Sequence, residues 1–463
     1  MNKGLYIGIA VGMIMMCTLT GCRGCQKDTE MHTEHHQNED SISVSNNIAS
    51  EDGKIMISLA GYEKNGAKNA LINCSGNNER FVVIEKETEK EVLNGKIQFY
   101  SKKTSGSETC GVCNFTSLDK TGSFYIRTDS GICSEEFIIK EGLYKDILKE
   151  KTAYSKENII KKEDINKDNI ENCFLSITDA VLAEEFFGEN TEKNGKDINR
   201  EIPERIKNVK IQTDALKELI NERGVLDTGI RADNDTYYQF SAVMSLFAYE
   251  YGSYDKKEAD VYAKVAEASY SHAEEYYEKT SAAKKKEVDD KRFWAAAQLY
   301  KLKGGKNYKE TAESYAENPP IGFSEERCGY LGTIAYLTCY NKIDLNIGEM
   351  FITALMKDIN GVIKEESVNA FMTSQEDDYR EESVSEAFET ARLMVLGNYI
   401  TKNIYYVETA ESYVDYLFGM NMLGKDCAYN PSSDYYTEPM SFILAGLIES
   451  YIYEDRQPEA MNR

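Results

Sequence analysis

The sequence predicts a multi-domain protein in which a β-sandwich precedes a larger all-α domain of repeated helical hairpins. Short apolar runs separated by Gly, Asn, Ser and Lys turns recur between residues 54 and 141, at the spacing typical of a sandwich. Further along the chain, apolar residues recur every three to four positions, and one hairpin-sized segment is repeated. At 463 residues, the chain is long enough for one small and one large domain.

Residues 1–22 have the pattern of a lipoprotein signal peptide. Lys3 precedes an apolar run from Leu5 to Met16, and Leu19-Thr-Gly-Cys22 resembles a bacterial lipobox, in which the cysteine becomes the lipidated first residue. The run is too short for a transmembrane helix. An ordinary signal peptide cut nearby is the alternative. We expect a protein at the extracellular face of the bacterial cell membrane, held to the membrane only by a lipid on Cys22.

Residues 23–53 are predicted to be a disordered tether. They are rich in Glu, Asp, Asn, Ser and His and have few apolar side chains to bury. His32, His35 and His36 lie in this segment, but no second ligand cluster defines a coordination geometry. We therefore expect no metal site and no cofactor.

The charge balance limits the kinds of partner. Lys and Arg number 54 against 78 Asp and Glu, so the net charge is -24, which repels nucleic acid and anionic membrane surfaces. A neutral or basic partner is favoured. The chain has one Trp and 32 Tyr, so any surface that stacks on a ligand must be mostly tyrosine. We expect Trp294 to lie in the core and His272 to be an ordinary helix histidine.

Residues 54–141 are expected to hold short strands and four cysteines. Export permits disulfides among these cysteines. The Cys110-Gly-Val-Cys113 motif lies in a strand-like stretch without a following helix or a second such pair, so a bridge or a structural thiol is favoured over a zinc or redox site. The four are Cys74, Cys110, Cys113 and Cys133.

Residues 142–463 are expected to form the helical domain. In Val288 to Glu317, two apolar helical stretches flank a break at Gly304-Gly305. The second half of this hairpin returns almost unchanged from Tyr406 to Asp415, and a looser copy runs over residues 241–277. Repeated hairpins of this kind stack side by side as a solenoid or close into a ring. An open helical-repeat binding protein remains the alternative.

Motifs spread over residues 54 to 455 have a pattern known from one family. In the first domain they are Gly61-Tyr62 with Lys68 and Ala70, Phe115 to Ile126, and Ser134 to Ile139. In the helical domain they are Ile177 to Phe187, Ile202 to Leu216, Asp235 to Ala242, Asp290 to Tyr300, Tyr416 to Gly424 and Pro439 to Leu447. These segments resemble family 9 glycoside hydrolases. The resemblance implies an immunoglobulin-like sandwich, a six-hairpin (α/α)6 barrel and a β-1,4-glucan such as cellulose as the polysaccharide partner.

The same resemblance implies where the catalytic base belongs. Enzymes of this family invert at the anomeric carbon, with a carboxylate base and a carboxylic acid roughly 6.5 to 9.5 Å apart. The base belongs just before the helix matched by Ile177 to Phe187, where Asp164 and Asp168 are the candidates. The family's surrounding glycines, Trp and His are absent there.

The acid position departs further from the family's pattern. Counting back from the motif of the last helix places Pro431 where the family has its acid. Asp434 and Glu438 are the candidate replacements, and Tyr435 and Tyr436 between them are candidate substrate-binding residues. The family's Pro-His-His-Arg substrate loop is not recognisable here.

Three functions are compatible with these observations. The first is a catalytically impaired relative that binds a glycan or a protein partner. The second is an active inverting endoglucanase with relocated carboxylates, which would need Asp164 or Asp168 to face Glu438 or Asp434. The third is a helical-barrel interaction scaffold, which would have its concave face filled by side chains. Loss of a positioned acid and base predicts that cellulose hydrolysis is absent or very weak.

Overall fold

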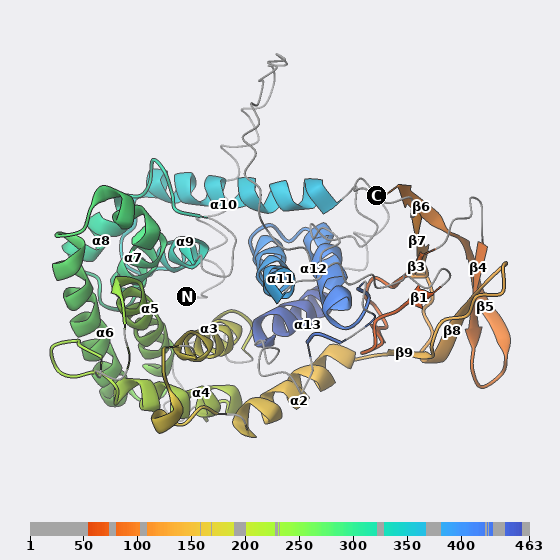
Figure 1. Cartoon of the computed structure of the whole chain (residues 1–463), viewed down its shortest axis with the longest axis horizontal. Coiled ribbons are helices and arrows are strands. Elements are labelled where there is room, and N and C mark those ends of the chain that lie inside the picture. Colours follow the sequence, from red (N-terminus) through yellow and green to blue (C-terminus); the bar gives the residue numbers. More distant parts are fainter. Residues whose placement is uncertain are drawn as a thin grey trace, which may run out of the picture.

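The computed structural model describes most of the two predicted domains. The described residues are 54–73, 80–101, 109–157, 159–167, 169–188, 201–226, 230, 232–321, 328–366, 381–421, 424, 426–428 and 440–455. All statements below concern these residues. Strands occupy one end of the molecule and helices the rest (Figure 1).

The first domain is a sandwich of two sheets. One sheet has the order β1 (Ile55–Met56), β3 (Asn69–Asn73), β7 (Thr109–Asn114) and β6 (Gln98–Ser101). The other has the order β2 (Tyr62–Glu63), β9 (Phe137–Lys140), β8 (Gly122–Thr128), β4 (Arg80–Glu85) and β5 (Lys90–Lys96). β2 pairs in parallel with β9, and the other neighbours are antiparallel.

Alternation along the strands explains the core of the sandwich. In β8 the buried and less buried side chains alternate, so Phe124 and Ile126 point inward, as the two-residue period of a strand requires. Edge-to-face contacts join the ring of Tyr62 to the rings of Phe115 and Phe137, at 5.0 and 5.3 Å between centroids. The contact with Phe115, which directly follows β7, joins the two sheets, whereas Phe137 belongs to the same sheet as Tyr62. Cys113 is buried on β7, and Cys133 is an exposed free thiol.

Helices α2 to α13 form the second domain as alternating inner and outer helices of a barrel. The inner helices are α3 (Ile170–Phe187), α5 (Asn234–Tyr251), α7 (Ala282–Lys303), α9 (Gly329–Leu337), α11 (Glu381–Thr401) and α13 (Ser441–Asp455). The outer helices are α2 (Leu143–Glu157), α4 (Glu204–Lys217), α6 (Lys256–Tyr277), α8 (Lys306–Glu313), α10 (Leu345–Glu366) and α12 (Ile404–Leu417).

The repeated segments are the predicted hairpins. The first pairs α7 with α8, the second α11 with α12, and the looser copy α5 with α6. Gly304 and Gly305 between α7 and α8 have φ angles of 73° and 103°, a left-handed backbone that glycine adopts without steric cost. The glycine pair therefore ends one helix and begins the next.

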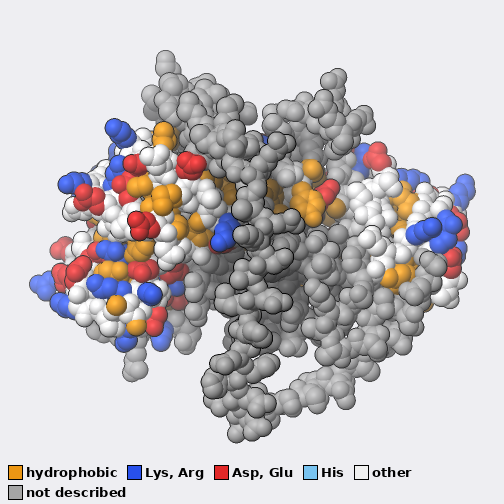
Figure 2. Space-filling model, turned by 90° about the horizontal axis from the view of Figure 1, so that it is seen from above, with side chains coloured by type: hydrophobic (Ala, Val, Ile, Leu, Met, Phe, Trp, Pro, Cys, Tyr) orange, Lys and Arg blue, Asp and Glu red, His pale blue; other side chains and the backbone are white. Residues whose placement is uncertain are grey.

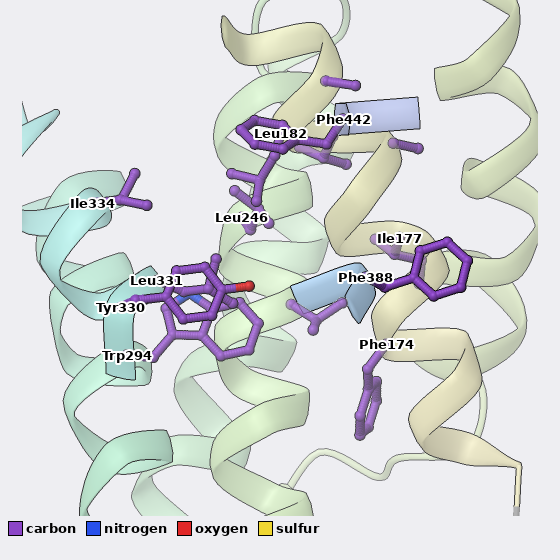
Figure 3. Packing of buried hydrophobic residues seen from close by; sticks show 14 of the residues in the cluster. Phe174, Ile177, Leu182, Leu246, Trp294, Tyr330, Leu331, Ile334, Phe388 and Phe442 are labelled. Carbon is purple, nitrogen blue, oxygen red and sulfur yellow. The ribbon is translucent and has the colours of Figure 1, made fainter. Parts of the chain in front are cut away.

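The inner helices fill the barrel with apolar side chains. Figure 3 shows labelled residues from all six of them in one cluster, including Phe174, Leu246, Phe388 and Phe442. α5 buries residues around its whole circumference, as a helix surrounded by other helices does. Trp294 is 4% exposed in this core, as predicted. Within the described residues, the interior of the barrel is thus packed with apolar side chains.

The sandwich is fixed to the barrel by buried polar contacts. The Glu63 carboxylate accepts hydrogen bonds from the backbone N–H of Gly142 (2.8 Å) and of Tyr144 (3.3 Å), at the start of α2. The Glu411 carboxylate on α12 accepts one from the N–H of Ala67 (2.9 Å). The N–H of Leu59 donates to the carbonyl of Phe418, 2.7 Å away. The last strand ends at Lys140 and α2 begins at Leu143, so no long linker separates the two domains. We therefore expect them to move as one unit.

The described surface carries mixed charges. Figure 2 shows one face on which Lys and Arg side chains are interspersed with Asp and Glu. His272 lies between two tyrosine rings, 4.6 Å from that of Tyr237 and 5.0 Å from that of Tyr276. Among the described helices, none is long and apolar enough to cross a membrane.

Candidate functional site

The inner helices of the barrel define two faces. We call the face at which they begin the N-face and the face at which they end the C-face. In the sequence, all the carboxylate candidates precede either α3 or α13. Of these candidates the structure describes only Asp164, which lies before the start of α3. We therefore take the N-face as the candidate site.

Asp164 is the one sequence-predicted site residue that the structure describes. It ends the short 3-10 helix η1 (Lys162–Asp164), which contains no buried residue. Its backbone carbonyl accepts hydrogen bonds from the side-chain amides of Asn166 (3.1 Å) and Asn169 (3.0 Å). These bonds close the turn on itself and leave the Asp164 side chain exposed. An exposed carboxylate on a closed turn is poorly placed to activate a water molecule in a water-excluded cleft.

The other predicted site residues lie outside the described residues. They are the base candidate Asp168, the acid candidates Asp434 and Glu438, the substrate-binding candidates Tyr435 and Tyr436, and the lipidation residue Cys22. Their roles stay predictions.

A buried ionic network holds the first turn of α13, the helix that follows the predicted acid segment in the sequence. The Asp179 carboxylate on α3 accepts hydrogen bonds from the backbone N–H of Ser441 (2.8 Å) and of Phe442 (3.2 Å), at the first turn of α13. It also lies 3.4 Å from the guanidinium of Arg392, which pairs with Glu389. The hydroxyl of Tyr330 donates to Glu389 at 2.7 Å. Asp179 thereby fixes the start of α13, directly after the predicted acid segment.

Each member of this network has a partner. Burial raises the pKa of Asp179, and Arg392 together with the two N–H donors opposes that rise. Sequence reasoning missed the network because its members are far apart in the chain. A signal was present, since Asp179 interrupts the apolar run I-T-D-A-V-L-A, and a charge on a fully buried helix face needs a partner.

A second polar cluster lies at the N-face between α5 and α7. The buried ammonium of Lys291 is 3.5 Å from a carboxylate oxygen of Asp235 and 3.5 Å from one of Asp290. Asp290 also accepts a hydrogen bond from the N–H of Cys328 (3.2 Å). One oxygen of Asp235 and both polar atoms of the Asn234 side chain are buried without a hydrogen-bond partner. The cluster therefore has unused donor and acceptor capacity.

Asp235 is chemically distinct from the other described carboxylates of the N-face. Burial raises its pKa to about 7, with Lys291 opposing the rise and Asp290 adding to it. The group therefore exchanges a proton near neutral pH. Sequence reasoning used Asp235 only as a helix motif. The signal was the second acid in Asp233-Asn-Asp235: Asp233 caps α5 by accepting from the N–H of Thr236, which leaves Asp235 without a capping role.

The polar cluster of Asn234, Asp235, Asp290 and Lys291 thus holds carboxyl, amide and ammonium groups close together. Within the described residues, no three His, Cys, Asp or Glu side chains stand close enough together to hold a metal ion.

Two family models match the chain. The model of glycosyl hydrolase family 9 matches residues 209–446, which is just over half of the chain. The model of the cellulase N-terminal ig-like domain matches residues 50–131. The two matches correspond to the barrel and to the sandwich. None of the curated proteins matches the chain.

Solved structures share the whole architecture at low identity. A family 9 structure from Bacteroides ovatus has a TM-score of 0.67 and 15% identity, and the match covers 86% of this chain and 99% of that one. A mutant thermostable endoglucanase from Alicyclobacillus acidocaldarius has a TM-score of 0.68 and 14% identity, with coverage of 86% and 100%. AaCel9A in complex with a cellobiose-like isofagomine has a TM-score of 0.69 and 14% identity, with the same coverage.

At these identities the solved structures establish the fold, and the family model establishes the family. The predicted (α/α)6 barrel behind an N-terminal immunoglobulin-like domain is confirmed. The chain belongs to glycosyl hydrolase family 9 and carries a cellulase N-terminal ig-like domain.

Proposed function

We propose that this chain is a lipid-anchored surface protein that binds β-1,4-glucan at the N-face and hydrolyses it very weakly or not at all. The observation that carries the proposal is the turn at Asp164, which is exposed and closed by its own asparagines at the place of the family's base. In the sequence, Pro431 stands at the place of the acid and has no proton to give. An inverting glycosidase needs both groups in one cleft, and the remaining candidates Asp168, Asp434 and Glu438 lie outside the described residues.

Binding without hydrolysis is supported by the polar cluster around Asp235. Sugar hydroxyls both donate and accept hydrogen bonds, so they fit the unused groups of Asn234 and Asp235. The neighbour AaCel9A holds a cellobiose-like isofagomine, which supports a glucan as ligand class. The chain's net charge of -24 also favours a neutral ligand.

Affinity electrophoresis in gels that contain a soluble β-1,4-glucan tests the binding. We expect the full chain to be retarded and Asp235→Ala to lose most of the retardation. Asp119→Ala is the matched control, since it removes an exposed carboxylate from the sandwich. Equal mobility of the wild type with and without glucan would contradict glycan binding and leave the protein-scaffold function.

A relocated catalytic acid is the second candidate function. It is favoured by the pKa of about 7 at Asp235, because a general acid works best when it titrates near the working pH. If the chain is active, Asp235→Asn should abolish sugar release and retain binding. Activity that survives this substitution would exclude Asp235 as the acid.

The anchor part of the proposal rests on Leu19-Thr-Gly-Cys22. In a bacterium, the full chain should partition into detergent and incorporate labelled fatty acid. Cys22→Ala should remove the label, and unchanged labelling in that variant would refute the lipobox.

A further inference from the structure

The opposite end of the barrel has a second convergence of polar and aromatic side chains. Five of the six inner helices contribute to it from their last turn or just beyond their end. We call this set the C-face cluster. It consists of Glu185 from α3, Tyr249 from α5, Lys301 from α7, Thr338 and Tyr340 after α9, and Tyr399 from α11.

Lys301 is the satisfied member of the C-face cluster. Its side chain is 1% exposed, and its ammonium pairs with a carboxylate oxygen of Glu185. The ammonium also donates to the hydroxyl of Thr338 at 2.8 Å and lies 4.6 Å from the ring centroid of Tyr249. These three contacts account for the three N–H donors of the ammonium.

Glu185 is only half satisfied. Its side chain is 8% exposed, and its second carboxylate oxygen is buried without a hydrogen-bond partner. A buried acceptor without a partner costs free energy, so the cluster is incomplete as it stands. A group that donates a hydrogen bond to this oxygen would complete it.

Three tyrosines belong to this end of the barrel. Tyr249 lies beside the Lys301 ammonium that pairs with Glu185, and the ring of Tyr399 packs edge to face on Phe186, with centroids 4.9 Å apart. Tyr340 follows Thr338, which accepts from the same ammonium, by two residues, and is 59% exposed. In keeping with this placement, burial and, after it, the negative charge of Glu185 raise the pKa of all three tyrosines. The cluster thus combines a buried ion pair with tyrosines, one of which is exposed.

The chemistry of the cluster selects a neutral donor. An anion is disfavoured by Glu185 and by the negative ends of five helix dipoles. A cation at the free oxygen of Glu185 would stand beside the ammonium of Lys301, and the like charges would repel. A hydroxyl group has neither problem, and a pyranose ring also has a C–H face that packs on tyrosine.

We propose that the C-face cluster is a second carbohydrate site, which binds a single pyranose unit through a sugar hydroxyl to Glu185 with Tyr340 against the ring. Tyr340 turns aside to let the hydroxyl reach the shielded oxygen. The choice of a sugar rests on the proposed function, but the site is separate from the N-face. Two sites at opposite ends of the barrel would let one anchored molecule hold two glucan chains.

Calorimetric titration of the full chain with cellobiose, in a detergent without a sugar headgroup, tests the proposal. We expect two cellobiose molecules per wild-type chain. Tyr340→Ala should bind one, because the affinity of the C-face site falls on the order of tenfold or more. Tyr340 is exposed, so its substitution leaves the core intact, and Tyr340→Phe separates loss of the hydroxyl from loss of the ring. Tyr125→Ala, on the sandwich, is the matched control.

The outcomes separate the two proposed sites. Asp235→Ala should lose the N-face site and keep the one removed by Tyr340→Ala. If Tyr340→Ala still binds two molecules, the inference is overturned and the proposed function is untouched. If Asp235→Ala keeps both molecules, the N-face proposal fails while the inference stands. Competition by tetramethylammonium at the site removed by Tyr340→Ala would overturn the inference by making it a cation site.

Discussion

The interior of the barrel and the turn at its N-face differ in how strictly folding constrains them. Asp179, Arg392 and Glu389 are buried and fully paired in the interior. Asp164 lies on an exposed turn, where its neighbours bond to its own backbone. Loss of a buried ionic partner leaves an uncompensated charge, whereas a surface turn tolerates substitution. Folding therefore constrains the barrel interior more strictly than the turn that carries Asp164.

The largest expected effect follows from the interior. Arg392→Met leaves the carboxylates of Asp179 and Glu389 buried without their cation. We expect the free energy of unfolding to fall by about 3 to 5 kcal/mol, which is typical when one partner of a buried ion pair is removed. Chemical denaturation of the full chain measures it. Lys162→Met breaks the exposed pair with Glu218 and should cost at most about 1 kcal/mol. Equal losses in both variants would erase the contrast between interior and surface.

The sequence predicted the parts of the molecule that depend on local pattern. The sandwich followed from short apolar runs separated by turn residues between 54 and 141, and the hairpins from Gly304-Gly305 and the repeated helix faces. The polar networks did not follow, because Asp179 and Arg392 are 213 positions apart and periodicity carries no information on such pairs. Asp164 was found only through the family motif around it, and its exposure is set by the side chains of Asn166 and Asn169.

A smaller effect is expected at the interface between the domains. Burial raises the pKa of Glu411 well above its usual value, with the N–H of Ala67 opposing and Asp415 adding to the rise. The unfolded chain loses the Glu411 proton at the ordinary pKa of about 4.5. Because the pKa is raised in the folded state, the folded chain still holds that proton above this pH. The stability contributed by Glu411 is therefore full at low pH and is lost as the pH rises.

Glu411→Gln should flatten this dependence, since an amide keeps an acceptor for Ala67 and does not ionise. Denaturation midpoints between pH 5 and 8 measure the slope. Burial also raises the pKa of Asp415, which remains in the variant. The slope of stability against pH therefore becomes smaller without vanishing. Glu141→Gln, at an exposed carboxylate, is the control and should leave the slope unchanged. A Glu411→Gln slope equal to that of the wild type would place the pH dependence elsewhere.

The smallest effect is expected at the turn itself. Asp164→Asn changes an exposed carboxylate and keeps the backbone carbonyl to which Asn166 and Asn169 donate, so the denaturation midpoint should stay within the error of measurement. Retardation by β-1,4-glucan should also stay unchanged. A clear loss of glucan retardation in Asp164→Asn would show that the turn contributes to the binding face after all.

Reducing-sugar release from a soluble β-1,4-glucan by the full chain tests the central claim most directly. Loss of a positioned general acid alone costs about 10² to 10⁴ in rate, and under the proposed function the base is absent as well. We predict release indistinguishable from a control without protein, under conditions where the same preparation is retarded by the glucan. Release at ordinary glycosidase rates would contradict the account and show that the catalytic pair has been relocated.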